Sequence, residues 1–148
     1  MKIISTFDGA YDFLSNFYEA PFKYQGILYP TNEHFFQAMK TLDINERKKI
    51  AAAETPGQAK RMGRKVALRE DWEEVKEDIM RIGLELKFEY PCLRKKLLAT
   101  GDAYLVEGTT WHDNEWGNCT CEKCKNIVGK NKLGTLLMQV REKILDGD

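Results

Sequence analysis

Apolar residues recur at helical spacing in two long segments, and this periodicity is the strongest constraint on how the chain can fold. In the first segment, from Asp71 to about Phe88, they are Trp72, Val75, Ile79, Ile82 and Leu86. In the second, after Asn131, they are Leu133, Leu136, Leu137, Val140 and Ile144. A helix with one apolar face buries that face against a partner, so both segments should contribute to a core.

Turn and capping signals divide the rest of the chain into shorter elements. Residues 20–24 and 27–29 flank Gln25-Gly26 and predict a hairpin. Further helices are expected over 32–42, after Asn45, over 55–64 and over 91–101, followed by a strand at 103–106 and a loop over 108–130. The expected N-caps are Thr31 or Asn32, Thr55, Asp71 (with Glu74 as a capping box) and Asn131. We therefore expect one domain over residues 1–148, mainly α, with α+β as the alternative and a few short N-terminal strands.

Composition excludes several classes of protein. Lys plus Arg and Asp plus Glu are both 23, and 43% of the residues are hydrophobic, which argues against disorder and against non-specific binding of duplex DNA. The chain has no apolar run near the length of a membrane span, and its first residues do not resemble a secretory signal. Three of the four cysteines fall within six residues, an unfavourable spacing for a secreted disulfide framework. These features favour a cytoplasmic protein that is not bound to a membrane.

The first expected helix carries an unusual polar face. Glu33, Gln37 and Lys40 lie at i, i+4 and i+7, so they share one side of the helix, whereas Phe35 and Met39 lie on the other. One interpretation is a solvated surface stripe. The other is a carboxylate, an amide and an amine directed into a cleft, with the helix dipole favouring the ionised form of Glu33.

The loop after residue 108 concentrates rare residues. Exposing Trp111 and Trp116 to water would cost free energy, so one interpretation is that they hold the loop against the body of the protein. The other is that they stack a base, with Asp113 as the group that transfers a proton. The pattern Cys119-x-Cys121-x-x-Cys124 offers three thiolates to a zinc ion, with His112, Cys92 or a water as a candidate fourth ligand. Because zinc sites usually contain paired CxxC units, we favour reduced cysteines and no metal.

Basic residues gather near the third expected helix. Arg61, Arg64, Lys65 and Arg69 form this cluster, and arginine is suited to bidentate phosphate contacts. A solvated basic helix end is the alternative interpretation. The chain has no P-loop and no GxGxxG motif, so neither standard nucleotide-binding fold is indicated.

Motifs along almost the whole chain resemble those of the NADAR, or YbiA-like, family. The matching segments are Phe13-Leu14-Ser15-Asn16-Phe17, Glu33 to Lys40, Met62-Gly63-Arg64, Asp71-Trp72, Met80, Lys87-Phe88, Leu97 to Gly101, Leu105-Val106-Glu107, Asp113 with Trp116-Gly117, Gly129 to Gly134, and Leu137-Met138. The resemblance implies a mainly helical fold and an N-glycosidase activity. We expect no cofactor.

The family resemblance implies two substrate types. One is ADP-ribose attached to guanine in a nucleotide or nucleic acid, and the other is the phosphoribosylamino pyrimidine intermediates of riboflavin synthesis. We favour ADP-ribosylated guanine, because the cysteine-rich segment replaces a glycine-rich segment of some riboflavin-type relatives. A non-catalytic module that binds ADP-ribose or NAD, and a zinc-stapled interaction domain, are rival functions. The oligomeric state stays open.

The same resemblance suggests catalytic roles. Glu33, Trp72 and Asp113 match positions held to be functional in the riboflavin-intermediate enzymes of the family, and Lys40 matches the family's lysine after the Gln-Ala-x pattern. We expect Glu33 to stabilise an oxocarbenium-like ribose and position water, and Asp113 to assist proton transfer. Lys40 either pairs with Glu33 or forms a Schiff base with a ring-opened sugar.

The expected substrate contacts come from five further residues. Trp116, together with Trp72, would stack the base, Arg64 would hold a phosphate, and Asn16 would contact a ribose hydroxyl or phosphate oxygen. Gln37 and Asn131 complete the expected binding set.

Overall fold

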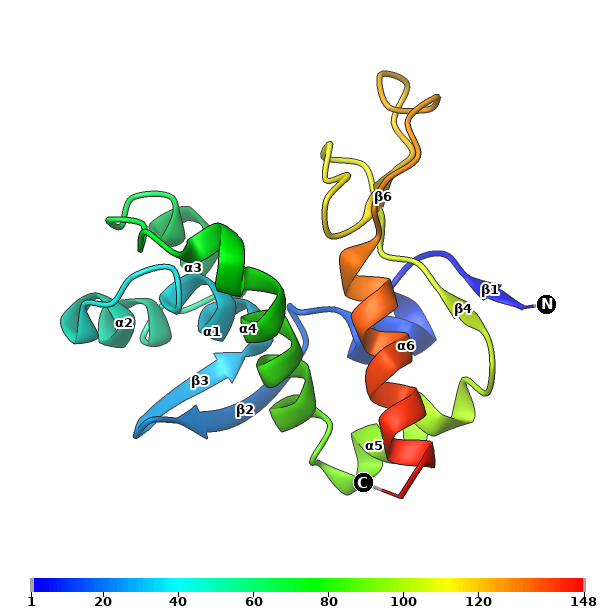
Figure 1. Cartoon of the computed structure of the whole chain (residues 1–148), viewed down its shortest axis with the longest axis horizontal. Helices are drawn as coiled ribbons and strands as arrows, with labels where there is room; N and C mark the ends of the chain where they lie inside the picture. Colours follow the sequence, from blue (N-terminus) through cyan, green and yellow to red (C-terminus); the bar gives the residue numbers. More distant parts are fainter. Residues whose placement is uncertain (1, 148) are drawn as a thin grey trace. The chain divides into compact units, whose positions relative to one another are not determined.

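The computed structural model describes residues 2–147 and is an α+β fold in which helices predominate (Figure 1). The chain divides into two units, which are described separately below. The central unit consists of residues 16–87, and the terminal unit consists of the segments before residue 16 and after residue 87. Within residues 2–147, no helix has the length and apolar character needed to cross a membrane. The expectation of one domain over 1–148 stays a prediction.

The central unit begins with a hairpin. Strands β2 (Glu19–Tyr24) and β3 (Ile27–Thr31) are antiparallel, as the sequence predicts. The turn residues Gln25 and Gly26 both have positive φ, at 50° and 82°, which matches the twist of a two-residue hairpin turn. The strand β3 leads directly into the helix α1 (Asn32–Ala38).

Helix α1 is buried along its whole length. It packs against β3, α2 (Ile44–Ala51), α3 (Pro56–Gly63) and α4 (Trp72–Lys87), and all seven of its residues are buried. On one side, Phe35 meets the rings of Phe22 and Tyr29 with centroid separations of 5.3 and 5.5 Å. Helix α1 ends at Ala38, so it is shorter than the helix expected over 32–42. Thr31 rather than Asn32 supplies the capping oxygen, which accepts from His34 N.

Helix α4 begins and ends close to its expected limits, but its buried face is rotated. Trp72 and Ile79 are buried as expected, whereas Val75, Ile82 and Leu86 are only half-buried. Met80 and Leu84 take their place in the core. The expected capping box is also not formed, because the Asp71 carboxylate accepts hydrogen bonds from the Arg69 guanidinium and Glu74 N bonds to the Asp71 backbone oxygen.

The terminal unit is built around the helix α6 (Lys132–Leu145). The strand β1 (Ile3–Ile4) pairs in parallel with β4 (Tyr104–Leu105), and α6 packs against β4 and against α5 (Pro91–Ala99). A short 3-10 helix, η1 (Gly9–Leu14), completes the N-terminal segment. The predicted apolar face of α6 is confirmed, with Leu133, Leu136, Leu137 and Val140 buried and Ile144 half-buried.

The segment expected as a loop over 108–130 contains a second pair of short parallel strands. They are β5 (Gly108–Thr109) and β6 (Asn118–Cys119), and the chain after β6 extends beyond the N-terminal end of α6 (Figure 1). A Cβ at Gly117 would overlap the Glu107 backbone oxygen, and one at Gly129 would lie 2.6 Å from Asn118 Cα. Glycine thus permits backbone segments to approach closely at the base of this loop.

Candidate active site

The polar face of α1 is buried within the central unit. Glu33 is 8% exposed and Gln37 is 4% exposed, so the surface-stripe interpretation is wrong. Gln37 Nε2 donates a 2.6 Å hydrogen bond to Glu33 Oε2 across one helical turn. Burying a carboxylate costs free energy unless it is hydrogen-bonded. The Gln37 amide therefore offsets the cost of burying Glu33 and also fixes the orientation of its carboxylate.

Helix α3 holds Gln37 in place through a glycine. A Cβ built at Gly63 would overlap Gln37 Oε1 and lie 2.9 Å from its Cδ. The absence of a side chain at Gly63 therefore lets α3 approach the Gln37 amide closely. Gln37 Oε1 is buried and has no hydrogen-bond partner among the described residues, so the Gln37–Glu33 bond and packing against Gly63 together orient this amide.

Lys40 lies one turn beyond Gln37, two residues after the end of α1, in partly aromatic surroundings. Its Nζ is 5.9 Å from the ring centroid of Phe36 and 5.9 Å from that of Trp72, and these rings pack with centroids 5.0 Å apart. Burial lowers the pKa of Lys40, Glu33 opposes this shift, and the cations Arg64 and Lys60 reinforce it. The neutral amine is therefore populated at a lower pH than in an ordinary lysine.

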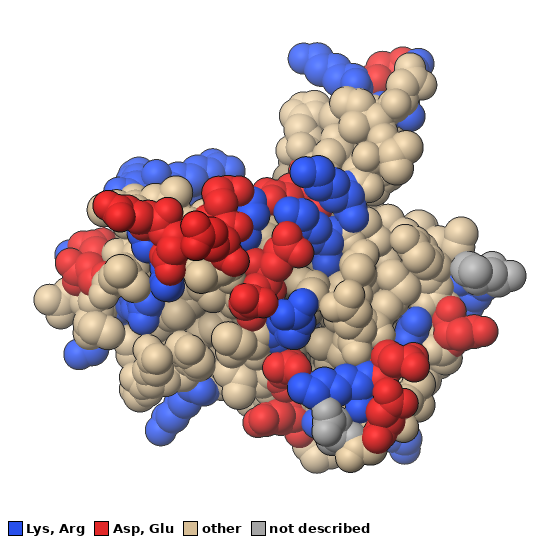
Figure 2. All heavy atoms as spheres, in the orientation of Figure 1, with Lys and Arg blue, Asp and Glu red and all other residues tan. Residues whose placement is uncertain are grey.

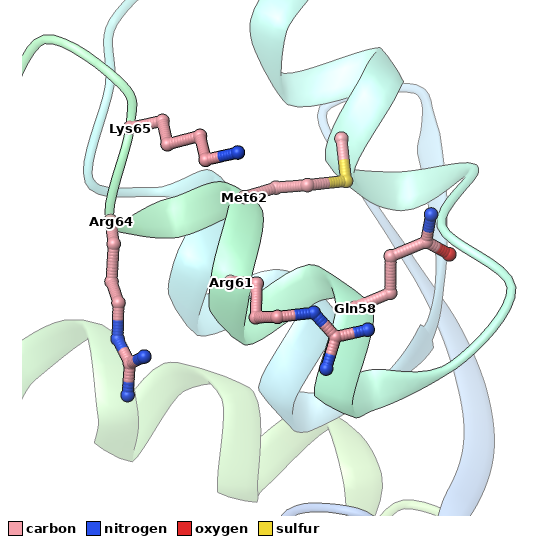
Figure 3. Close-up of a pocket in the computed structure, with 5 residues that line it drawn as sticks. All are labelled: Gln58, Arg61, Met62, Arg64 and Lys65. Carbon is pink, nitrogen blue, oxygen red and sulfur yellow. The ribbon is translucent and has the colours of Figure 1, made fainter.

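Helix α3 and the residues that follow it form a basic hollow, and one of its charges influences the pKa of Lys40. Its volume is about 430 Å³, and its lining residues are Gln58, Arg61, Met62, Arg64 and Lys65. Arg61 extends beside Gln58, whereas Arg64 extends away from them (Figure 3). In the central unit, acidic side chains gather over α4 and basic ones along the edge formed by α3 (Figure 2). The positive charge of Arg64 contributes to the lowered pKa of Lys40.

Asp113 and Trp116 belong to the terminal unit and contact each other. Asp113 Oδ1 accepts hydrogen bonds from the backbone N–H groups of Glu115 and Trp116, at 3.1 and 2.9 Å. Lys132 pairs with Glu115 at 3.0 Å, and its Nζ is 5.8 Å from the Trp116 ring centroid. These contacts build a turn that presents a half-exposed carboxylate beside a half-exposed indole.

Two of the expected binding residues are engaged in the scaffold. In the central unit, Asn16 Oδ1 accepts from Asn32 Nδ2 at 2.9 Å, and the Asn16 backbone oxygen accepts from Glu33 N at 3.0 Å. In the terminal unit, Asn131 donates to the Leu105 backbone oxygen and accepts from Glu107 N. Asn131 occupies the N-cap position of α6, but its side chain does not cap the helix as the sequence suggested.

A NADAR domain model matches residues 5–145. The chain belongs to the NADAR family. The N-glycosidase YbiA of Escherichia coli is 47% identical over 147 residues, covering 97% of this chain and 88% of that protein. An N-glycosidase of Nostoc punctiforme is 39% identical, covering 90% of this chain and 86% of that protein. The NMR structure of the E. coli YbiA protein superposes with a TM-score of 0.83 at 43% identity, covering 98% of this chain and 86% of that one.

A further relative is named for riboflavin biosynthesis. A riboflavin biosynthesis protein of Vibrio vulnificus is 35% identical and covers 93% of this chain, but only 36% of that protein. The relatives named N-glycosidase indicate that this chain is a hydrolase that acts on N-glycosyl compounds.

The expected site residues of this NADAR-family chain fall into both units. The central unit contains Glu33, Gln37, Lys40, Arg64, Trp72 and Asn16, and the terminal unit contains Asp113, Trp116 and Asn131. Two residues outside the expected set also contribute to the site: Phe36 places a ring beside Lys40, and Gly63 packs against Gln37. The i, i+4 spacing of Phe36 and Lys40 was the available signal for the first. The contact of Gly63 depends on tertiary packing and has no local signal.

Proposed function

We propose that this N-glycosidase removes ADP-ribose from ADP-ribosylated guanine. The observation that carries the proposal is the buried Glu33 carboxylate, which Gln37 orients at 2.6 Å. Cleavage of an N-glycosidic bond develops positive charge on the ribose, and a fixed carboxylate in a water-poor site stabilises that charge. Glu33 is the group that meets the developing cation and positions the attacking water.

The basic hollow supports a diphosphate-bearing substrate. Arg61, Arg64 and Lys65 supply three positive charges, and Arg64 has the fork geometry that suits phosphate oxygens. Two linked phosphates, as in ADP-ribose, compensate these charges more completely than one. Asn16 stays a proposed contact for a ribose hydroxyl or phosphate oxygen.

Lys40 has two proposed roles beside Glu33. As an ammonium it pairs with the carboxylate, and as a neutral amine it attacks the aldehyde of a ring-opened sugar. The amine and aldehyde lose water as the C=N bond of a Schiff base forms. Burial lowers the Lys40 pKa and so favours the second role. Trp72, buried against Phe36, forms part of the aromatic surface next to this amine.

Asp113 and Trp116, in the terminal unit, have proposed roles of their own. Asp113 assists transfer of a proton to the leaving base, and Trp116 stacks that base. Gln37 acts through Glu33 and is a positioning residue. Asn131 stays a proposed binding residue, although both polar groups of its side chain are already bonded within the terminal unit.

The phosphoribosylamino pyrimidine intermediates of riboflavin synthesis are the second candidate substrate. The family member of Vibrio vulnificus named as a riboflavin biosynthesis protein favours this alternative. Such a substrate carries a single phosphate, for which Arg64 alone would suffice.

Parallel assays test the proposal. ADP-ribosylated guanosine and a ribosylaminouracil phosphate are incubated with the protein, and the released base is measured by mass spectrometry. We expect guanine-base release, and Glu33→Gln should reduce it about a hundredfold to a thousandfold with the fold intact. Glu46→Gln is the matched control, since Glu46 lies on the surface of α2 beside Lys49.

The outcomes separate the candidate functions. Release from the pyrimidine substrate alone would replace the guanine proposal with the riboflavin alternative. Binding of ADP-ribose in a calorimeter without release of either base would indicate a binding module. Near-normal release by Glu33→Gln would exclude the role given to Glu33.

A further inference from the structure

Four side chains of types that can ligate a metal converge in the terminal unit, outside the groups used above. They are His112, Cys119, Cys121 and Cys124, and their ligand atoms all lie within 4.8 Å of one another. His112 Nδ1 is 3.3 Å from Cys121 Sγ and 3.4 Å from Cys124 Sγ. In a tetrahedral site with Zn–S bonds of about 2.3 Å and a Zn–N bond of about 2.0 Å, the N···S edge is about 3.5 Å and the S···S edge about 3.8 Å. The two N···S distances already match a tetrahedral edge.

The backbone explains why residues separated in sequence meet here. The parallel pairing of β5 with β6 sets Thr109 opposite Cys119, which brings the segment containing His112 alongside the first cysteine. His112 adopts a left-handed φ of 69°, an uncommon conformation for a residue with a side chain. A hydrogen bond from Cys124 N to the Cys121 oxygen closes the turn between the last two cysteines.

The surroundings of Cys119 resemble those of a metal thiolate. The backbone N–H groups of His112 and Cys121 both donate to Cys119 Sγ, at 3.3 and 3.5 Å. Hydrogen bonds to a ligating sulfur orient it and stabilise its negative charge. Cys119 and Cys124 are buried, and all four cysteines of the chain are free thiols.

We propose that His112, Cys119, Cys121 and Cys124 bind one Zn²⁺ in a closed, four-coordinate structural site. Three soft thiolates and one imidazole suit zinc better than magnesium or calcium, which prefer oxygen ligands. Four protein ligands leave no coordination position for substrate, so the ion does not take part in bond cleavage. On binding, the three thiol protons are released to solvent.

The proposed site encloses the segment that carries Asp113 and Trp116. Asp113 directly follows one ligand, and Trp116 precedes Cys119 by three residues. A metal that joins both ends of this segment reduces its conformational freedom. Zinc would thus fix the loop geometry that the proposed proton-transfer and stacking groups require, whichever N-glycoside is the substrate.

Metal analysis of the full chain, purified without a histidine tag, tests the proposal. We expect one zinc per chain, a loss of zinc in Cys121→Ser and Cys124→Ser, and full retention in His112→Cys, which substitutes one zinc ligand for another. Cys92→Ser is the matched control, because Cys92 is exposed on α5 and lies outside the cluster. Parent protein that takes up no zinc from an equimolar solution would overturn the proposal, as would Cys92→Ser losing zinc equally.

Two measurements on the parent chain avoid any dependence on variants that fail to fold. Cobalt(II) substitution should give the intense visible bands of a tetrahedral ion and a thiolate charge-transfer band. With zinc bound, only Cys92 should react rapidly with a thiol reagent, and a chelator should expose the other three of the four cysteines. An octahedral cobalt spectrum, or equal reactivity of all cysteines before and after chelation, would contradict the site.

A local readout connects the ion to the loop. After chelation, amide hydrogen exchange should accelerate over residues 109–129 and stay unchanged in α1, which belongs to the other unit. Unchanged exchange over 109–129 would overturn the structural role.

Discussion

Lys40 is the residue whose chemistry depends most on its surroundings. Because burial lowers its pKa, the neutral amine becomes populated at a lower pH than in an ordinary lysine, and only that form attacks an aldehyde. If the Schiff-base route operates, cyanoborohydride added during turnover should leave a sugar adduct on Lys40. The fraction of reactive neutral amine should rise with pH with a midpoint below the ordinary lysine pKa of about 10.4, and the adduct yield should follow this rise.

The adduct is located by peptide mass spectrometry. Lys40→Arg is the control, because it keeps a cation near Glu33 but offers no nucleophilic amine. An unmodified Lys40 in a protein that releases base at the normal rate would leave only the ion-pairing role.

His34 follows Glu33 in the sequence and is also buried, but its side chain faces a different environment. Its Nδ1 lies 2.8 Å from Thr31 Oγ1 and its Nε2 lies 3.0 Å from the Ala53 oxygen, so a neutral ring with its proton on Nε2 satisfies both contacts. Burial lowers the pKa of His34, opposed by its bond to Ala53. The neutral ring is therefore part of the core of the central unit.

The lowered pKa of His34 predicts a loss of stability in acid. Below the ordinary histidine pKa of about 6.5, the unfolded chain takes up a proton that the folded chain resists, so the free energy of unfolding falls as pH falls. His34→Gln should flatten this dependence between pH 7.5 and the acid range, measured by urea unfolding. An equally steep dependence in the variant would assign the acid sensitivity to other groups.

At the level of single residues, sequence spacing placed Glu33 and Gln37 on one helix face but could not show that this face is buried. A polar stripe on an isolated helix is compatible with either environment. Burial arises because β3, α2, α3 and α4 all pack around α1. The scaffold roles of Asn16 and Asn131 likewise depend on partners that are distant in sequence, such as Asn32 and Leu105.

The packing of α3 against α1 gives a prediction at the level of elements. Gly63→Ala places a methyl group into the Gln37 side chain, so we expect a loss of about 1–3 kcal/mol in unfolding free energy and reduced base release. Gly57→Ala is a matched control in the same helix, where the nearest atoms to an added Cβ are 3.9 Å away. Denaturant unfolding and the release assay together check both variants, and equal effects of the two would contradict the proposed contact.

Elements defined by local signals were predicted well. Thr55 accepts from Gln58 N with Pro56 at the start of α3, as the sequence indicated, and the hairpin turns at Gln25-Gly26 as expected. The parallel pairs β1–β4 and β5–β6 were not predicted. Each strand in them has two residues, which is too short for an alternating pattern, and each parallel pairing joins segments separated by an intervening stretch of chain.

The balanced charge of the whole molecule gives a prediction about nucleic acid. With 23 basic and 23 acidic residues, the chain has no net attraction for a polyanion, although the basic hollow provides a local one. ADP-ribose removal from a short modified oligonucleotide should therefore depend weakly on salt, because few phosphates are contacted and few counterions are released.

The salt dependence is measured as the logarithm of kcat/KM against the logarithm of salt concentration. ADP-ribosylated guanosine serves as the control, since it lacks the oligonucleotide backbone. A slope much steeper for the oligonucleotide than for the nucleoside would indicate extensive contacts with the nucleic acid.

The sequence by itself determined the helical character, most element limits, the family and the candidate residues, because periodicity, caps and motifs are local properties of the chain. The tertiary structure decided which face of α4 enters the core, that the Glu33–Gln37 pair is buried, and that Gly63 packs against it. It also decided that His112, rather than Cys92, lies with the three clustered cysteines. These properties require contacts between segments far apart in sequence, and packing alone selects among the partners that a local pattern leaves open.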